Sequence, residues 1–211
     1  MKNLDTRIYF ITDSTPYSEQ EFLARVRSAL SGGVSLIQLR EKQRTTREYI
    51  DLAQKVGALA AQFGVPLIID DRIDVALAAG VKGVHLGQSD MPIKTARRIL
   101  GEDYIIGATA KTVEQALEAY EQGADYLGVG AIYPTTTKVK TVLTSTETLD
   151  KICKAVPIPV NAIGGLNKDN IDVLKGIGIK GVCAVSAIMK APDPKTAAEE
   201  LSAAVKEKLG I

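Results

Sequence analysis

The segment Gly33-Val34-Ser35-Leu36 joins a glycine that can end a helix to the start of an apolar, strand-like run. The same arrangement returns at Gly80-Val81-Lys82-Gly83, Gly123-Ala124-Asp125-Tyr126 and Gly178-Ile179-Lys180-Gly181. Each copy precedes a strand of even number along the chain, the second, fourth, sixth or eighth. A β-α-β-α unit is therefore predicted to recur four times, and such repetition favours a closed architecture.

Outward from these copies, short apolar runs alternate with longer stretches of helical period. The predicted strands are residues 8–12, 36–39, 67–69, 83–86, 104–106, 126–129, 158–162 and 181–185. Between strands five and six, Val113, Ala116, Leu117 and Tyr120 stand at i, i+3, i+4 and i+7, the spacing of one helix face. Capping boxes predict four helix starts, at Ser18 with Glu21, Thr45 with Glu48, Thr112 with Gln115 and Thr144 with Glu147.

Eight β-α units in 211 residues leave about 26 residues for each, close to the minimum for a compact (β/α)8 TIM barrel. The alternative is an open, doubly wound sheet. Against it, the first strand is followed by Ile11-Thr12-Asp13-Ser14-Thr15-Pro16 in place of a G-x-G-x-x-G fingerprint. No linker divides the chain, so residues 1–211 are predicted to form one domain.

Composition excludes several classes of function. With 26 Lys and Arg against 25 Asp and Glu, the chain lacks the basic excess of a nucleic-acid-binding protein. No stretch reaches 18 apolar residues, so we expect no membrane span, no membrane partner and a cytoplasmic location. The only two cysteines, Cys153 and Cys183, have no C-x-x-C spacing and are expected to be buried, reduced thiols.

In a barrel of this type, chemistry is carried by the loops at the carboxyl ends of the strands. After strand two, alternation directs Gln38, Arg40 and Lys42 to one side. This arrangement predicts a site for an anion, and the alternative is an exposed strand end paired with neighbouring helices.

Asp70 and Asp71 follow strand three, and Asp90 follows strand four. Mg2+ typically takes one or two carboxylates together with phosphate oxygens and water, and Asp71 with Asp90 is the predicted pair. Helix capping by the aspartates is the alternative. The only histidine, His85, has no nearby His or Cys, and a hydrogen-bonded structural role is favoured over catalysis.

Hydroxyls and a cation follow strand six, at Thr135, Thr136, Thr137 and Lys138. Gly164 and Gly165 follow strand seven, and Ser186 opens a short helical segment after strand eight, which is the usual phosphate-binding place of such barrels. Two anion sites are thus predicted to face each other across one mouth. No activated nucleophile is visible, so the chemistry is expected to be electrostatic, such as departure of pyrophosphate.

Taken in order, these loops resemble those of the thiamine phosphate synthase family. The blocks that carry the resemblance are Ile11-Thr12-Asp13, Gln38-Leu39-Arg40-Glu41-Lys42, Asp70-Asp71-Arg72-Ile73-Asp74-Val75-Ala76, Gly83-Val84-His85-Leu86-Gly87-Gln88-Ser89-Asp90-Met91, Gly123-Ala124-Asp125-Tyr126, Thr135-Thr136-Thr137-Lys138, Ala162-Ile163-Gly164-Gly165 and Val185-Ser186-Ala187-Ile188. Only the second and fourth blocks are specific when taken singly.

The resemblance implies a transferase that joins hydroxymethylpyrimidine diphosphate to hydroxyethylthiazole phosphate. The products would be thiamine phosphate and pyrophosphate, formed by a Mg2+-assisted, dissociative substitution. Both substrates are small phosphorylated molecules, and a homo-oligomer is compatible with the sequence.

By motif, Arg40, Lys42 and Lys138 would hold the diphosphate, Asp71 and Asp90 the Mg2+, and Gln38 the pyrimidine. The thiazole phosphate would lie against Thr135, Thr137, Gly165 and Ser186, and Val185 is a further predicted substrate-binding residue. Lys138, Arg40 and Thr109 are the predicted catalytic residues.

Three positions depart from the family pattern. Asp70, a predicted substrate-binding residue, replaces the usual Asn and would either bind metal or turn away. Thr109, also predicted to touch substrate, replaces a serine and keeps the hydroxyl. Val139-Lys140-Thr141 follows Lys138 in place of Lys-Asp, which predicts either a different closure of this loop or an altered affinity for its substrate.

Two other functions stay open on the same fold. A thiazole tautomerase would need a histidine after strand five, where this chain has Lys111. A non-catalytic sensor of phosphorylated ligands would be expected to have lost metal or diphosphate residues. Arg40, Lys42, Asp71 and Asp90 are all retained, which argues against the sensor.

Overall fold

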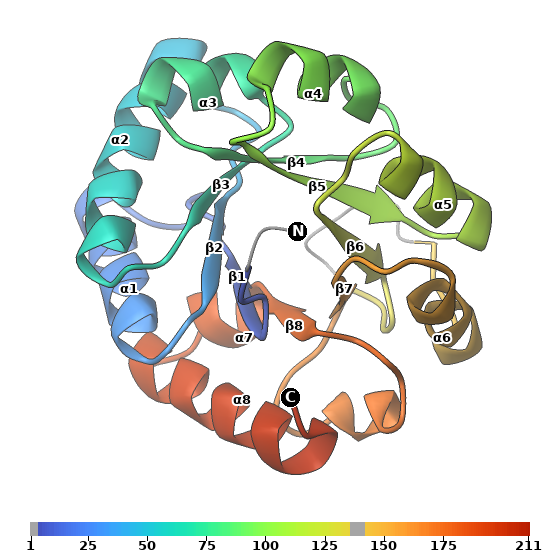
Figure 1. The fold of residues 1–211 in the computed structure, drawn as a ribbon. Coiled ribbons are helices and arrows are strands. Elements are labelled where there is room, and N and C mark those ends of the chain that lie inside the picture. The colour runs from blue at the N-terminus through green and yellow to red at the C-terminus, as the bar shows by residue number, and fades with distance from the viewer. Residues whose placement is uncertain (1–3, 136–141) are drawn as a thin grey trace.

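Eight parallel strands form a closed barrel in a computed structural model of the chain that describes residues 4–135 and 142–211 (Figure 1). The strands are β1 (Ile8–Ile11), β2 (Leu36–Leu39), β3 (Leu67–Asp70), β4 (Gly83–Leu86), β5 (Ile105–Ala110), β6 (Tyr126–Gly130), β7 (Val160–Ile163) and β8 (Gly181–Ala184). They pair in sequence order, and the barrel closes where β1 pairs with β8, Tyr9 opposite Cys183. The predicted (β/α)8 fold is confirmed.

Helices surround the barrel on its outside (Figure 1). They are α1 (Glu19–Ser31), α2 (Thr46–Gln62), α3 (Ile73–Ala79), α4 (Ile93–Leu100), α5 (Val113–Glu121), α6 (Thr146–Ala155), the 3-10 turn η1 (Ile171–Leu174), α7 (Ser186–Met189) and α8 (Pro194–Leu209). The unit after β7 therefore carries a single 3-10 turn where the repeat predicts a helix. No helix in the described part of the chain is long and apolar enough to span a bilayer.

Alternation along each strand separates two cores. Outward residues such as Phe10, Ile37 and Leu127 pack against the helices in the larger cluster. A smaller cluster fills the inside of the barrel, and its buried members are Tyr9, Ile11, Leu36, Ile68, Tyr126 and Cys183. Packed side chains therefore fill the inside of the barrel below the carboxyl ends of the strands.

Three of the four predicted residues cap their helices, but only one of them forms the predicted capping box. Thr45 and Glu48 form a complete capping box, while the hydroxyls of Ser18 and Thr112 accept from backbone amides without a complete box. The prediction at Thr144 is wrong by one residue, because Ser145 caps α6 and the Thr144 amide instead donates to the carbonyl of Ala131.

Two further sequence predictions need correction. Strand β5 continues to Ala110, four residues beyond its predicted end, so Thr109 lies within the strand. The fourth glycine of the repeat, Gly178, does not adopt the left-handed conformation of Gly33, Gly80 and Gly123; Gly176 does so in its place, after η1. The cysteine prediction is confirmed in part, since both thiols are free and Cys183 is buried, but Cys153 is only half-buried.

Barrel closure at β8 depends on a residue without a side chain. A Cβ at Gly181 would overlap the backbone carbonyl oxygen of Thr6. Replacement Gly181→Ala is expected to lower the free energy of unfolding by about 1–3 kcal/mol, measured by urea titration, because the clash is with backbone and forces a shift of the strand.

Gly178→Ala is the matched control, three residues away. Its Cβ would meet its nearest heavy atom, the Cβ of Cys153, at an ordinary 3.6 Å. This variant should stay within about 0.5 kcal/mol of the parent. Equal stability of the two variants would contradict a steric requirement at residue 181.

Candidate active site

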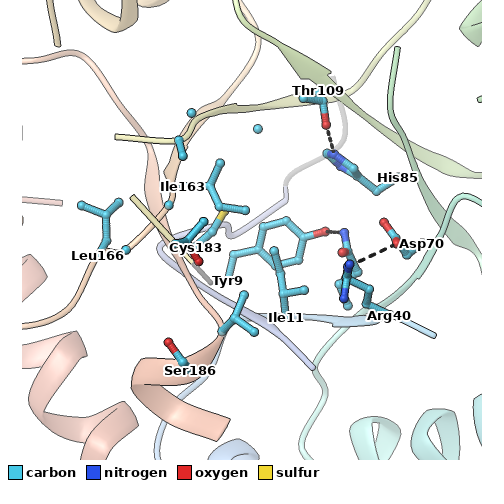
Figure 2. A pocket seen from close by; sticks show the side chains of 18 of the residues that line it. Tyr9, Ile11, Arg40, Asp70, His85, Thr109, Ile163, Leu166, Cys183 and Ser186 are labelled. Carbon is cyan, nitrogen blue, oxygen red and sulfur yellow. Dashed lines mark hydrogen bonds and ion pairs between the residues drawn. The ribbon is translucent and has the colours of Figure 1, made fainter. Parts of the chain in front are cut away.

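A cavity of about 180 Å³ opens where the strands end at their carboxyl termini (Figure 2). Its lining includes the predicted site residues Gln38, Arg40, Asp70, Thr109, Thr135, Gly165, Val185 and Ser186. These residues lie in strands β2, β3 and β5 and in the segments that follow β2, β6, β7 and β8. The structure thus brings together most of the positions that the sequence placed at one mouth.

One side of the cavity carries a cluster of charges. The Nζ of Lys42 lies 2.6 Å from Oδ2 of Asp70 and also contacts Asp71, and Nε of Arg40 lies 3.9 Å from the same Asp70 oxygen. Burial raises the pKa of Asp70 to about 6, the charge of Asp71 adds to this, and the two cations oppose it. Asp70 therefore points into the cavity and is paired with cations.

The predicted metal pair lies at the rim beside this cluster. Asp71 has a φ of 60°, a left-handed conformation that Asp tolerates better than most residues. Asp90 Oδ2 accepts a hydrogen bond of 2.7 Å from the amide of Gly87. Burial raises the pKa of Asp90, and the nearby Asp71 carboxylate adds to that rise. The two carboxylates from the ends of β3 and β4 are thus close enough to interact.

Donor chemistry at this rim fits Mg2+. Within residues 4–135 and 142–211, no group of three or more His, Cys, Asp or Glu could enclose a metal ion. Mg2+ does not need such a cage, because it keeps several waters and takes one or two carboxylates plus substrate phosphate. The mutually repelling Asp71 and Asp90 carboxylates, already balanced in part by Lys42, form a place that favours added positive charge.

The opposite side of the cavity is built from backbone. Gly164 and Gly165, with φ of 109° and 65°, turn the chain after β7. A Cβ at Gly164 would overlap Ala131, and one at Gly165 would lie 2.8 Å from the Cβ of Tyr133. The turn therefore packs closely against the segment after β6, and both glycines line the cavity together with Ser186, the first residue of α7.

Thr109 and His85 meet at the back of the cavity. His85 Nε2 lies 3.0 Å from Oγ1 of Thr109 (Figure 2). Its Nδ1 lies 3.2 Å from the hydroxyl of Tyr126. The expected hydrogen-bonded role of His85 is therefore what the geometry shows. Thr109 reaches this position from inside β5, because the longer strand directs it inward.

Several lining residues were not foreseen from the sequence. Tyr9 lies on the cavity floor in β1, Cys183 in β8, and Lys111 just beyond β5. Alternation along β1 and β8 could have placed Tyr9 and Cys183 inside the barrel, but apolar runs give no sign of a ligand. Of the predicted residues, Thr137 and Lys138 lie outside the described residues.

Comparison with known proteins shows which family the chain belongs to. A family model described as thiamine monophosphate synthase matches residues 8–188. The chain belongs to this family. Thiamine-phosphate synthase 2 of Streptococcus pneumoniae serotype 4 is 50% identical over 187 residues, which are 89% of each chain. The thiamine-phosphate synthase of Methanobrevibacter smithii is 48% identical over 201 residues, 95% of this chain and 96% of its own.

Solved structures agree in fold. Thiamine phosphate pyrophosphorylase from Pyrococcus furiosus superposes with a TM-score of 0.89 at 42% identity and covers 98% of both chains. A 3-hexulose-6-phosphate synthase, at 18% identity and a TM-score of 0.72, shares the fold alone. The function of the family, thiamine-phosphate synthesis, is that of this chain, and the chain is accordingly an enzyme and a transferase.

The charge cluster predicts a coupled effect on stability. Lys42→Gln removes the nearest cation from the buried Asp70 carboxylate and is expected to lower the free energy of unfolding by about 1–2 kcal/mol, since a poorly compensated buried charge remains. The double variant Lys42→Gln with Asp70→Asn should recover most of that loss. A double-mutant cycle by urea unfolding in metal-free buffer measures the coupling, and additive effects would contradict it.

Proposed function

We propose that the chain joins hydroxymethylpyrimidine diphosphate to hydroxyethylthiazole phosphate, with Mg2+, and releases pyrophosphate. The observation that carries this proposal is that one cavity has the cation Arg40, with Lys42 beside it, on one side, and the Gly164-Gly165 turn with Ser186 on the other. Figure 2 shows Arg40 beside Asp70 on one side and Ser186 on the other, with Tyr9 and Ile11 between them. Two phosphorylated substrates require two such sides.

The diphosphate is proposed to lie against Arg40 and Lys42. Their present partners, Asp70 and Asp71, are carboxylates that an incoming diphosphate and its metal would partly replace as counter-charges. Gln38, buried beside them on β2, is proposed to hydrogen-bond the pyrimidine ring. Thr109 is proposed to donate its hydroxyl hydrogen to a diphosphate oxygen, which accepts such bonds strongly.

Asp71 and Asp90 are the residues proposed to hold Mg2+. When bound, the ion would neutralise charge on the leaving pyrophosphate. The residues of the chain itself supply the remaining positive charge, from Arg40 and Lys42 and, by motif, from Lys138. Positive groups held in place before the reaction lower its barrier, because they need little rearrangement as negative charge develops.

The thiazole phosphate is proposed to bind the other side. Backbone amides of the Gly164-Gly165 turn and the hydroxyls of Ser186 and Thr135 are suitable donors to a phosphate, with Val185 beside them on the cavity wall. Thr137 is assigned to this group by motif alone. Binding there would hold the nucleophilic ring facing the pyrimidine, so that reaction becomes effectively unimolecular.

Incubation with both substrates tests the proposal. Purified protein, both phosphorylated substrates and Mg2+ should give thiamine phosphate, followed as its oxidised fluorescent derivative, and EDTA should abolish the product. Asp71→Asn and Asp90→Asn should each lower kcat/KM by more than about tenfold at 1 mM Mg2+, with part of the loss recovered at higher Mg2+, because a carboxylate ligand is lost. Undiminished turnover in EDTA would contradict the metal.

Lys138 provides a second test of mechanism. Lys138→Ala is expected to lower kcat by about a hundredfold or more and to change KM much less, because its charge is proposed to act on the leaving group as charge develops. Lys140→Ala, two residues along the same segment, is the matched control and should keep kcat within about twofold. Equal activity of the two variants would remove the proposed role of Lys138.

Location and assembly are predictions only. A cytoplasmic enzyme is expected from the sequence, and a homo-oligomer is compatible with it. Size-exclusion chromatography with light scattering measures the second directly.

A further inference from the structure

Five side chains form a continuous hydrogen-bonded chain across the barrel interior, here called the barrel relay: Gln38, Tyr9, Tyr126, His85 and Thr109. Nε2 of Gln38 donates to the hydroxyl of Tyr9 at 2.7 Å, and the hydroxyls of Tyr9 and Tyr126 lie 2.7 Å apart. The Tyr126 hydroxyl lies 3.2 Å from Nδ1 of His85, and Nε2 of His85 lies 3.0 Å from Oγ1 of Thr109.

The relay connects two ends of the cavity through its floor. Gln38 and Thr109, its terminal residues, both line the cavity, whereas Tyr126 is fully buried beneath it. The five residues come from five strands, β2, β1, β6, β4 and β5 in relay order. No helix or loop takes part, so the relay is held by the most rigid portion of the fold.

Two glycines make room for the relay. A Cβ at Gly107 would overlap the Tyr126 ring and hydroxyl, and a Cβ at Gly128 would lie 3.3 Å from Cε1 of His85. Both glycines occupy inward positions of strands β5 and β6, where a barrel of this size ordinarily places a filling side chain. The absence of side chains at these two positions thus leaves space for the rings of Tyr126 and His85.

The direction of the hydrogen bonds follows from the orientation of the Gln38 amide, whose Nε2 faces the Tyr9 hydroxyl. Tyr9 accepts from Gln38 Nε2, which has no lone pair to offer in return, so the single hydrogen of Tyr9 is donated to Tyr126. Tyr126 then donates its own hydrogen to Nδ1 of His85. Burial raises the pKa of Tyr9 and of Tyr126 well above the ordinary value, so both phenols keep these hydrogens.

This direction determines the tautomer of the histidine. With Nδ1 accepting, a neutral imidazole carries its hydrogen on Nε2 and donates it to Oγ1 of Thr109. The Thr109 hydroxyl then accepts from His85, and its own hydrogen is available for donation to another acceptor. In the reverse direction, Thr109 would donate to His85, and Gln38 would present its amide NH2 to the cavity in place of Oε1.

We propose that Tyr9, Tyr126 and His85 are positioning residues. Through their hydrogen bonds they orient the Gln38 amide toward the pyrimidine and the Thr109 hydroxyl toward the diphosphate of the same substrate. The relay leaves Oε1 of Gln38 as an acceptor for the exocyclic amine of the pyrimidine. At the other end it leaves the Thr109 hydroxyl as a donor to the diphosphate. This assignment rests on the proposed function, since it names the parts of the pyrimidine substrate that each end meets.

The tautomer can be measured without any substrate. His85 is the only histidine of the chain, so an untagged, 15N-histidine-labelled full-length protein gives the nitrogen resonances of one ring. Above the pKa of the ring we expect Nε2 to show a protonated, pyrrole-type shift and Nδ1 an unprotonated, pyridine-type shift. The opposite pattern would overturn the direction of the relay, whatever the activity of the protein.

Variant Tyr126→Phe interrupts the relay at its middle. Its two histidine shifts should move toward each other as both tautomers become populated. Its kcat/KM for the pyrimidine diphosphate should fall about tenfold, with KM for the thiazole phosphate within about twofold, because only the first substrate meets the relay ends. Unchanged histidine shifts in a folded variant would overturn the proposal.

Thr6→Val is the matched control. It removes another buried hydroxyl of the barrel interior, the one that donates to Asn161 Oδ1 at 2.8 Å, and touches no relay residue. It should lower stability yet keep both the histidine shifts and the kinetic constants. A wild-type protein with the Nε2–H ring but no thiamine phosphate formation would overturn the proposed substrates and leave the direction of the relay standing.

Discussion

Closure of eight parallel strands is the constraint on which the rest of this molecule depends. Because β1 pairs with β8 as the other neighbours pair with each other, all strand ends of one polarity meet at a single rim. Residues that are 155 positions apart, such as Thr6 and Asn161, become hydrogen-bonded neighbours inside one wall. The charge cluster, the glycine turn and Ser186 share one cavity for the same reason.

Closure also forces the inward side chains to fill a fixed volume. This barrel fills it unequally, with two tyrosines and a histidine on some strands and glycines opposite them on others. The hydroxyls of the two tyrosines and the nitrogens of the imidazole each find a partner across the interior, and a buried polar group without one would be costly. The two tyrosines and the histidine thus both fill the barrel interior and orient the polar groups of the site.

Sequence patterns predicted the parts of this design that are local. Alternation placed Gln38, Arg40 and Lys42 on one side, and the aspartates after β3 and β4 were expected at one rim. The length of β5, and with it the inward position of Thr109, was missed because Gly107 and Ala108 weaken a strand pattern. The partnership of Tyr9 with Tyr126 could not be predicted, since 117 residues separate them and only barrel register joins them.

The pairing of large rings with glycines inside the barrel limits which substitutions such a sequence can accept during evolution. A larger residue at 107 is sterically admissible only when the ring at 126 has already been lost, and the same holds, less severely, for 128 and the imidazole at 85. Single substitutions at these four positions pass through poorly packed or crowded intermediates. Among related sequences, the paired positions should therefore vary jointly or not at all.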